Sequence, residues 1–303
     1  MLKQHKLSDK LGSTVGVGIL SWKSHKTLER SLQSYEKVGF KELFDEVKII
    51  FQEISDDDIA LANKYGYDYV GTEKNLGIQH GHKLIYENLD TDYILVLEND
   101  NPIVENELVV EQILEKSINF LKQNKIDVMR LRHRWNFGES FSLEKYLNYY
   151  NVTKLHPNYI FDELDTNNKA SFSKFFKKIF RKEKALRVAG YGLYFEQNPH
   201  EVFPEFVEKI EDEIYAVNSR ILTWTNQSVL LKREFYGKLL EYSYKNPSSR
   251  TANGFQDLEK PLNSKWWRTQ NFKIGICNGL FTHNRFDDSW RKTHQAFNSE
   301  IKN

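Results

Sequence analysis

Residues Tyr93–Pro102 read YILVLENDNP, and their apolar first half passes directly into side chains that carry oxygen acceptors. These side chains are Glu98, Asn99, Asp100 and Asn101. The apolar half predicts a buried strand. A carboxylate is costly to desolvate unless water, a cation or a backbone cap compensates it. Because Asn101-Pro102 is also typical of a turn, this strand end is either a solvated turn or a binding site, and the rest of the chain must decide between the two.

The first hundred residues alternate between strand-like apolar runs and helix-like segments. Strands are expected at Val15–Leu20, Val47–Phe51, Tyr67–Val70 and Tyr93–Leu97, and helices at Lys26–Lys37, from Asp56 onward and at Ile78–Asn88. Strand followed by helix, repeated in this way, predicts a parallel sheet with helices on its faces. The expected fold class is therefore α/β.

Polar or acidic side chains follow several of the predicted strands. The segments concerned are Leu20-Ser21-Trp22, Gln52-Glu53 and Glu98-Asn99-Asp100. In parallel sheets ligands bind outside the carboxyl ends of the strands, so we expect these segments to converge on one cleft. This convergence favours a binding site over a solvated turn at Asp100.

The rest of the chain is predicted to be less regular. A helix is expected at Glu105–Gln123 and a strand at Asp127–His133, followed by strand-like runs at 187–195 and 221–224, a helix at Glu234–Tyr244 and a final strand at 271–277. We therefore divide the chain into residues 1–135, a polar insertion at 136–186 and residues 187–303.

The composition argues against several classes of protein. The chain has 303 residues, of which 40% are hydrophobic, so it can bury a sizeable core. A formal net charge of +1 does not favour a nucleic-acid partner, and a single cysteine, Cys277, leaves no internal disulfide framework. No run approaches the roughly 20 apolar residues that span a bilayer. The polar N-terminus lacks the apolar segment of a signal peptide, so we expect a cytoplasmic protein.

Residues 171–184, SFSKFFKKIFRKEK, form a basic amphipathic helix in helical projection. The apolar face would hold Phe172, Phe175, Phe176, Ile179 and Phe180, and the basic face Lys174, Lys177, Lys178, Arg181 and Lys182. Such a helix can lie in a membrane interface, which would make the protein peripheral to the membrane. The alternative is a helix docked on the protein's own core with a solvated basic face.

Gly16 and Gly18 raise the alternative of a dinucleotide site. Both lie inside the first predicted strand, whereas a GxGxxG site needs its glycines in the turn after that strand. A nucleotide can instead be held at the strand ends with its diphosphate neutralised by a divalent ion. A hard cation takes oxygen ligands, and Asp100 has the right chemistry and position for this role.

Three stretches carry a family resemblance: Val17–Trp22, Glu73–Asp100 and the acidic triplet at Glu98–Asp100. They resemble the nucleotide-binding half of GT-A fold glycosyltransferases of the family 2 type. In that family an Asn-x-Gly segment, a helix and a strand ending in an acidic motif follow one another, as Asn75-Leu76-Gly77 and the triplet do here. The resemblance implies a GT-A fold, with a Rossmann-like, mostly parallel sheet, helices on both faces and a helical or mixed C-terminal acceptor region.

The resemblance also implies roles for individual residues. Asp100 would be a metal ligand, Glu98 would contact the ribose or a metal-bound water, and Glu53 would contact the nucleoside. His283, after the last predicted strand, would be the second metal ligand, with Asn284 and Arg285 near the diphosphate. The remaining residues expected to bind the nucleotide sugar are Leu20, Ser21, Trp22, Asn75, Gly77, Lys83 and Asn99.

Two carboxylates, Asp257 and Glu259, precede an aromatic-rich segment. Many inverting enzymes of the GT-A fold have an acidic residue at the start of such a helix as the base that deprotonates the acceptor. A helix N-terminus favours the ionised carboxylate, and a base must reach the hydroxyl that it activates. Asp257 is the first choice and Glu259 the second, and helix capping is the alternative role for both.

The resemblance thus predicts a glycosyltransferase, EC 2.4, of the hexosyltransferase type, that depends on Mn²⁺ or Mg²⁺. It would move a sugar from a nucleoside diphosphate sugar, with a UDP-sugar favoured, to a hydroxyl of a glycan or lipid-linked acceptor, with inversion. One alternative is a sugar-1-phosphate nucleotidyltransferase, although residues 21–25, SWKSH, match its Gly-rich loop poorly. The other is a non-catalytic carbohydrate-binding protein on the same fold, which would not need Asp257.

Overall fold

The computed structural model describes residues 5–138, 143–155, 172–249, 251 and 254–285. Its centre is a nine-stranded sheet in the order β3-β2-β1-β4-β8-β5-β9-β7-β6. The strands are β1 Val15–Ser21, β2 Glu46–Phe51, β3 Asp68–Gly71, β4 Tyr93–Glu98, β5 Val128–Arg132, β6 Val207–Glu211, β7 Ile214–Asn218, β8 Val229–Lys232 and β9 Lys273–Phe281. Strands β8 and β7 run opposite to the others, so the sheet is mostly parallel, as predicted.

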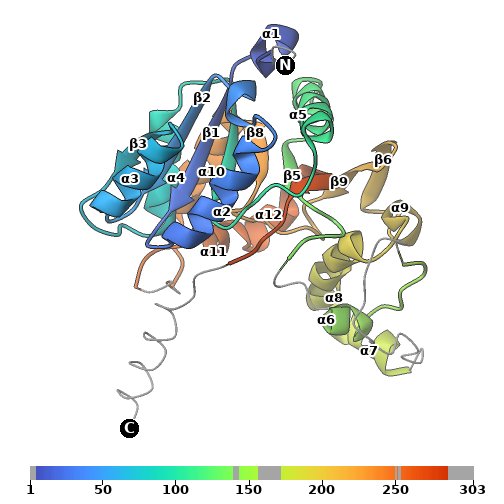
Figure 1. Ribbon diagram of the computed structural model, residues 1–303. Coiled ribbons are helices and arrows are strands. Elements are labelled where there is room, and N and C mark those ends of the chain that lie inside the picture. The colour runs from blue at the N-terminus through green and yellow to red at the C-terminus, as the bar shows by residue number, and fades with distance from the viewer. Residues whose placement is uncertain (1–4, 139–142, 156–171, 250, 252–253, 286–303) are drawn as a thin grey trace.

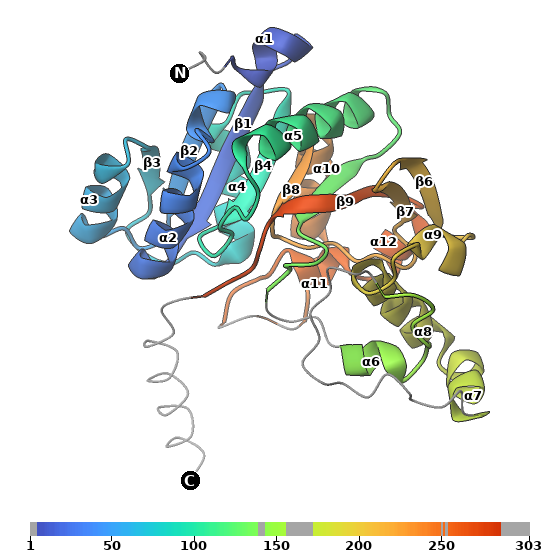
Figure 2. The same ribbon diagram turned by 45° about the vertical axis from the view of Figure 1, so that its right-hand side comes forward.

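Helices cover both faces of this sheet (Figure 1, Figure 2). The α-helices are α1 Leu7–Leu11, α2 His25–Glu36, α3 Asp56–Lys64, α4 Ile78–Asn88, α5 Glu107–Lys122, α6 Leu143–Leu147, α7 Phe172–Phe180, α8 Lys182–Ala189, α9 Pro199–Val202, α10 Arg233–Lys245, α11 Glu259–Leu262 and α12 Lys265–Thr269. Short 3₁₀ turns occur at η1 Lys41–Leu43 and η2 Gly190–Tyr194. The predicted α/β fold class, with helices on both faces, is confirmed.

The sheet separates two hydrophobic cores. Helices α2, α3 and α5 pack on one face, and α4 and α10 pack on the other. In β4, Leu95 belongs to the first core, whereas Ile94 and Val96 belong to the second. This explains why the central strands read as continuous apolar runs, since both of their faces are buried. Gly18 lets α4 approach β1, because a Cβ at this position would lie 2.4 Å from Ile85.

The C-terminal segment completes the same sheet rather than forming a second one. Strand β8 is inserted between β4 and β5 and is antiparallel to both. Strand β9 pairs in parallel with β5, and β7 and β6 extend the sheet to its edge. Residues 1–135 and 187–303 therefore share one sheet. The sequence did not reveal β6, β7 or β8.

Two predicted strands are wrong. Residues 187–195 form the end of α8 and the turn η2, and residues 221–224 form no strand. Both segments are apolar and buried, and a short buried run does not distinguish a strand from a helix. They pack against each other through a close backbone approach, because a Cβ on Gly190 would lie 2.3 Å from the carbonyl oxygen of Ile221.

Helix α7 turns much of its apolar face to the solvent. Lys174 is buried, and its Nζ donates to Asn151 Oδ1 at 2.7 Å and to the Tyr150 carbonyl oxygen. Phe175 and Phe180 of the apolar face are 61% and 79% exposed. The interpretation of a helix docked on the core through its apolar face is therefore wrong for residues 174–180. Its basic side chains Lys178, Arg181 and Lys182 are exposed, as that interpretation expected.

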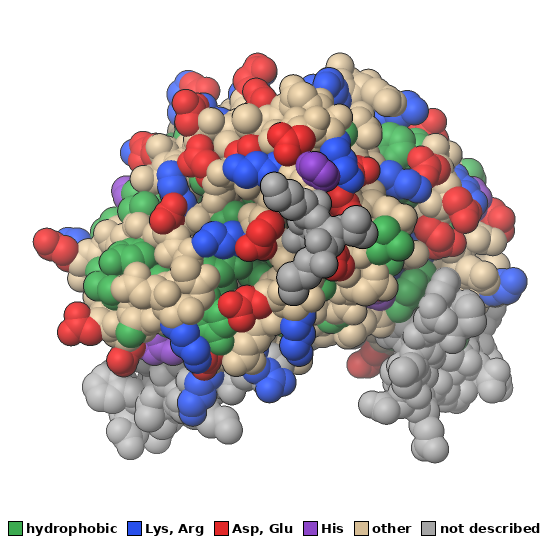
Figure 3. Space-filling model, turned by 45° about the horizontal axis from the view of Figure 1, so that its top comes forward, with side chains coloured by type: hydrophobic (Ala, Val, Ile, Leu, Met, Phe, Trp, Pro, Cys, Tyr) green, Lys and Arg blue, Asp and Glu red, His purple; other side chains and the backbone are tan. Residues whose placement is uncertain are grey.

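Acidic and basic side chains are interspersed over the face seen obliquely from above the view of Figure 1 (Figure 3). Among the residues that the structure describes, no helix has the length and apolar character needed to cross a bilayer.

Candidate active site

The carboxyl ends of β1, β2 and β4 meet at one edge of the sheet. Leu20 pairs with Glu98 across β1 and β4, and Ser21 pairs with Phe51 across β1 and β2. Backbone hydrogen bonds continue this alignment past the strands: Asn99 N–H donates to the Leu20 carbonyl oxygen at 2.9 Å. The three segments expected to converge therefore lie at one edge.

Asp100 is the centre of this edge. Its side chain is buried, and Oδ2 accepts a hydrogen bond from His283 Nε2 at 3.0 Å and another from Arg285 Nε at 2.8 Å. The segment after β9 is fixed here by its backbone, because Asn284 N–H donates to the Asp100 carbonyl oxygen at 3.0 Å. The structure thus brings together Asp100, His283 and Arg285 from distant parts of the chain.

His283 and Arg285 determine the charge state of Asp100. Burial alone would raise the pKa of the Asp100 carboxyl. The hydrogen bonds and charges of His283 and Arg285 outweigh burial and lower this pKa below its usual value. The carboxylate is therefore ionised at neutral pH and available as a ligand.

Asp100 and His283 fit the requirements of a divalent ion. Two ligands at right angles on an ion with bonds of about 2.1 Å lie about 3.0 Å apart. The structure has the same separation, 3.0 Å, in the hydrogen bond between Oδ2 and Nε2. A divalent ion there would take the place of the shared proton, and Nε2 would be the unprotonated nitrogen of the ring. Among the described residues no group of three or more His, Cys, Asp and Glu side chains forms a metal cage. Mg²⁺ is usually bound by one or two carboxylates, with substrate phosphates and water completing its coordination, and Asp100 is a ligand of this type.

Glu98 joins the site from the last residue of β4. Its Oε2 accepts a hydrogen bond from Gln227 Nε2 at 3.0 Å, and Gln227 lies just before β8. Burial, followed by the nearby negative charge of Asp100, raises the pKa of Glu98 to about 8. Glu259 adds to this repulsion. With this pKa Glu98 is mostly protonated at neutral pH. Three carboxyl groups thus share a poorly solvated region, and a bound cation would favour their ionised forms.

Asp257 and Glu259 approach this region from the other half of the chain. Asp257 is buried, and its Oδ1 accepts from the backbone N–H of Glu259, two residues later, at 3.0 Å. The N-cap of α11 is Leu258, so Asp257 lies just outside the cap position. Glu259 Oε1 accepts from Asn226 N–H at 3.0 Å. Burial raises the pKa of Glu259, and the charge of Asp257 acts in the same direction. The two carboxylates therefore form one hydrogen-bonded unit with Asn226.

Glu53 lies beyond the end of β2 in a strained conformation, with φ at 54°. It accepts hydrogen bonds from Trp22 Nε1 at 3.1 Å and from Lys23 Nζ at 2.5 Å. The hydrogen bond from Lys23 lowers the pKa of Glu53. Trp22 and Glu53, both expected to bind the nucleotide sugar, are therefore in direct contact.

The Asn75-Leu76-Gly77 segment is fixed by its neighbours. Asn75 Oδ1 accepts from Gly77 N–H at 2.8 Å, and the buried Gln52 side chain binds both Leu76 N–H and the Gly77 carbonyl oxygen. Gly77 has φ at 84°, and a Cβ there would lie 2.4 Å from Phe255. The segment that leads into Asp257 thus packs against the start of α4.

Lys83 is not among the residues gathered around Asp100. Its Nζ pairs with Glu87 at 3.4 Å and lies 5.9 Å from the centre of the Tyr244 ring. Ser21, in contrast, lies at the site edge, and its buried Oγ has no hydrogen-bond partner among the described residues.

Asn226 and Gln227 are site residues that the sequence did not reveal. They precede β8, and β8 itself was not predicted. The only signal was a pair of amide side chains before the short apolar run Val229–Leu231. Gln52 was expected at the site edge, but its role in holding residues 76 and 77 was not.

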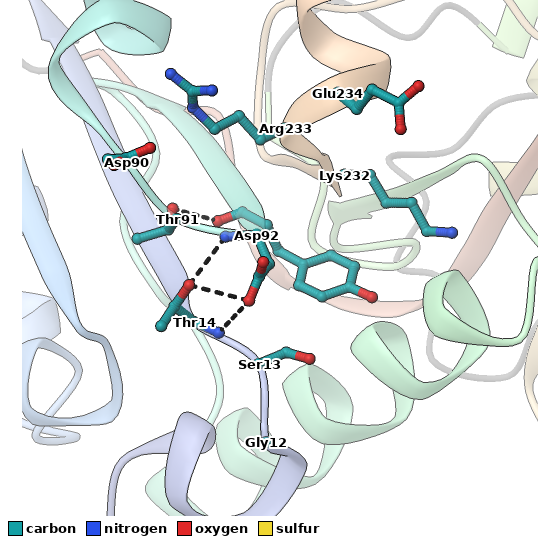
Figure 4. Close-up of a pocket in the computed structure, with 10 residues that line it drawn as sticks. Gly12, Ser13, Thr14, Asp90, Thr91, Asp92, Lys232, Arg233 and Glu234 are labelled. Carbon is teal, nitrogen blue, oxygen red and sulfur yellow. Dashed lines mark hydrogen bonds between the residues drawn. The ribbon is translucent and has the colours of Figure 1, made fainter.

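A cavity of about 570 Å³ lies at the opposite edge of the sheet, where β1 and β4 begin (Figure 4). Asp92 Oδ2 accepts from the N–H of Thr14 at 2.8 Å (Figure 4). Arg233 Nε donates to the Leu89 carbonyl oxygen at 2.8 Å. Thr14, Asp92 and Arg233 thus hold chain segments together, and we do not assign a second candidate site to this cavity.

No family model and no curated protein matches the chain. Comparison with solved structures finds TarS residues 1–349 from S. aureus, with 13% identity, a TM-score of 0.47, and coverage of 89% of this chain and 60% of that chain. It also finds the Pyrobaculum calidifontis mannosyltransferase PcManGT in complex with GDP-Man and Mn²⁺, with 10% identity, a TM-score of 0.47, and coverage of 96% and 65%.

Glucosyl-3-phosphoglycerate synthase from Mycobacterium tuberculosis, in complex with Mn²⁺, UDP-Glc and phosphoglyceric acid, is similar over a shorter region. Identity is 19%, the TM-score is 0.33, and the match covers 41% of this chain and 45% of that chain. The chain therefore matches less than two thirds of the length of each of these proteins. PcManGT and the synthase bear glycosyltransferase names, and glycosyltransferases are the class that the sequence resembles. With TM-scores below 0.5, these likenesses add nothing to the argument about activity.

Proposed function

We propose that this protein is a glycosyltransferase that moves a sugar from a nucleoside diphosphate sugar to a hydroxyl group of an acceptor. The observation that carries the proposal is the convergence of His283 and Arg285 on the buried carboxylate of Asp100 at the carboxyl ends of the strands. A solvated turn would not require a buried carboxylate that contacts both an imidazole and a guanidinium group. A diphosphate site requires positive groups next to an acidic metal ligand.

In this proposal Asp100 and His283 hold Mn²⁺ or Mg²⁺. A divalent ion bound there would supply the positive charge that stabilises the leaving diphosphate. Arg285 would exchange its hydrogen bond to Asp100 for one to a phosphate oxygen, since a guanidinium binds phosphate in the same way as carboxylate. Glu98 would accept a hydrogen bond from the ribose or a metal-bound water.

The nucleoside would lie over the ends of β1 and β2. The edge there is formed by Leu20 and Ser21, by Asn99, and by the contacting pair Trp22 and Glu53. Glu53 would contact the nucleoside, and the fixed Asn75–Gly77 segment would line the site next to the residues that lead to Asp257. A UDP-sugar is the favoured donor.

The proposed base is Glu259 or Asp257. Each carboxylate accepts one backbone N–H, but Asp257 is buried whereas Glu259 is partly exposed, and we therefore favour Glu259. Burial raises the pKa of Glu259, and a carboxylate with a raised pKa is the stronger base. Asp257 would then orient Glu259, and attack by the deprotonated acceptor would invert the configuration of the sugar carbon.

The acceptor is proposed to be a glycan or a lipid-linked molecule at a membrane surface. Phe175, Ile179 and Phe180 of α7 are 61%, 54% and 79% exposed. Lys177 and Lys178 lie between these residues in the sequence, so α7 combines an apolar face with cations. This combination fits the interface of a bilayer with anionic lipids. In this arrangement the protein is peripheral to the membrane.

The test is release of nucleoside diphosphate from a panel of nucleotide sugars with Mn²⁺, with Mg²⁺ and with EDTA. Wild-type protein should release product from one donor in the presence of metal. Asp100→Asn should reduce the rate at least about a hundredfold, because it removes a proposed metal ligand. The matched control is Asp212→Asn, an exposed residue of the β6–β7 turn. Undiminished release by Asp100→Asn would exclude the metal assignment.

A further inference from the structure

A second cavity, of about 650 Å³, lies between α6, α7 and α8. Its basic lining side chains are Lys145, Lys177, Arg181, Lys184 and Arg187, and we call it the basic pocket. Tyr149 and Val188 are buried and form an apolar part of its wall. The volume is within the range of sites for small organic ligands.

The cations of the basic pocket are close together along one side of the chain. Lys177 and Arg181 are four residues apart, and Arg181, Lys184 and Arg187 follow at intervals of three. Lys177 belongs to α7, Arg181 is the N-cap of α8, and Lys184 and Arg187 lie within α8. The acidic residue of α8, Glu183, pairs with Arg268 at 3.3 Å. Arg181, Lys184 and Arg187 are exposed, so a bound anion could interact with several of these cations at once.

No carboxylate in the described part of the chain forms an ion pair with Lys177, Arg181, Lys184 or Arg187. The positive charges of neighbouring lysines also affect the pKa of Lys174. Burial, followed by the charges of Lys178 and Lys177, lowers the pKa of Lys174. This differs from the face shown in Figure 3, where acidic and basic side chains are mixed. The basic pocket is thus a local concentration of positive charge in a protein whose net charge is +1.

The basic pocket adjoins the proposed site of the acceptor. Thr223 lines the pocket, and its carbonyl oxygen accepts from Arg130 at 2.6 Å. Three residues later in the same loop, Asn226 binds Glu259. Because three residues of extended chain span at most about 11 Å, an acceptor could reach both the pocket and the base.

We propose that the basic pocket binds a phosphate group of the acceptor substrate, so that the acceptor is a phosphorylated molecule. This inference rests on the proposed function, because the acceptor is the second substrate of the proposed glycosyltransferase. Arginine and lysine side chains are the preferred partners of phosphate oxygens. The apolar wall would contact the organic group that carries the phosphate. The phosphorylated acceptor is either a lipid phosphate or a soluble phosphate ester. The two have the phosphate group in common.

The test uses isothermal titration calorimetry with two probes, inorganic phosphate and octyl phosphate. The variant is Arg181→Gln/Lys184→Gln/Arg187→Gln, which removes charge from the basic pocket without altering the proposed catalytic residues. The control is Lys37→Gln/Lys125→Gln/Lys238→Gln, which removes the same charge elsewhere on the surface. Wild type and control should bind with equal affinity, and the pocket variant about a hundredfold more weakly. Circular dichroism establishes that both variants are folded.

Equal weakening in both variants, or no saturable binding by wild type, would overturn the proposal. Tighter binding of octyl phosphate than of inorganic phosphate supports a lipid source, and equal binding supports a soluble one. A parallel titration with UDP and GDP in the presence of Mn²⁺ separates the two proposals. If a nucleotide binds and the phosphate probes do not, only the pocket proposal fails. If phosphate binds and no nucleotide does, the proposed function fails, and with it the assignment to an acceptor.

Discussion

Asp100 Oδ2 lies 3.0 Å from His283 Nε2, although 183 residues separate the two along the chain. The contact joins the end of β4 to the segment after β9, and Arg285 binds the same oxygen. A carboxylate and an imidazole nitrogen at this distance can share one divalent ion. The first prediction concerns this pair.

His283→Gln should weaken Mn²⁺-dependent binding of the nucleoside diphosphate at least about tenfold, because it removes one of two proposed protein ligands. Affinity in the absence of Mn²⁺ should change much less. Titration calorimetry with and without the metal measures both. His200→Gln, at a histidine on α9, is the matched control. Equal losses with and without Mn²⁺ would show that His283 acts only through the fold.

Glu259→Gln should lower kcat at least about a hundredfold, because it removes the proposed base while keeping the shape of the side chain. Asp257→Asn should have a smaller effect on kcat, since its proposed role is to orient Glu259. Steady-state kinetics of both variants at saturating donor distinguish the two carboxylates. A larger loss of kcat in Asp257→Asn would reverse these roles. Full activity in both variants would show that neither Asp257 nor Glu259 is the catalytic base.

Removing exposed aromatic side chains from α7 should weaken membrane binding. Phe175→Ser/Phe180→Ser should reduce flotation with liposomes that contain anionic lipid, since each buried Phe contributes about 2 kcal/mol. The control Leu108→Ser removes a side chain that is 62% exposed on α5. If the wild type does not float with anionic liposomes, or the α7 variant floats as well as the control, α7 is not a membrane contact.

His82 should make the protein less stable in mild acid. It is buried on α4, where its Nδ1 lies 2.6 Å from the hydroxyl of Tyr236 on α10, and burial lowers its pKa from 6.5 to about 3. Below pH 6.5 the unfolded chain therefore binds a proton that the folded protein does not. Stability is lost as the pH falls from 6.5 toward 3, by about 2 kcal/mol between pH 7 and pH 5.

Urea denaturation of the wild type and of His82→Gln at pH 7 and pH 5 measures how much the free energy of unfolding of each protein falls between the two pH values. The variant is less stable at pH 7 but should lose about 2 kcal/mol less than the wild type on going to pH 5. His80→Gln, on the same helix, controls for general effects of substitution. Identical losses in the wild type and His82→Gln would show that His82 does not carry this pH dependence.

The nucleotide half of the fold could be predicted from the sequence, because its strands and helices alternate with strong periodicity. The order of motifs also indicated that Asp100, His283 and Arg285 belong together, and the structure brings them into contact. That they bind metal and diphosphate stays a prediction.

The helix predicted from residue 105 begins at Glu107, because Asn106 caps it.

The remaining features depend on tertiary packing that periodicity does not encode. Strand β8 is only four residues long, and its place between β4 and β5 is set by the sheet. Gln227 could therefore not be assigned to Glu98. In α7 the amphipathic pattern was correct, but the buried side is fixed by the hydrogen bond from Lys174 to Asn151, which lies 23 residues away. A helical projection cannot determine which face turns inward.

The most direct measurement is a thermal-shift panel of UDP, GDP, CMP and NAD, each with and without Mn²⁺, on the wild type and on Asp100→Asn. We expect one nucleoside diphosphate to raise the melting temperature of the wild type only when Mn²⁺ is present, and we expect Asp100→Asn to lose this shift. That result would identify the base of the donor. If no nucleotide shifts the wild type, or if Asp100→Asn keeps the full shift, the strand end at Asp100 is not a metal-dependent diphosphate site.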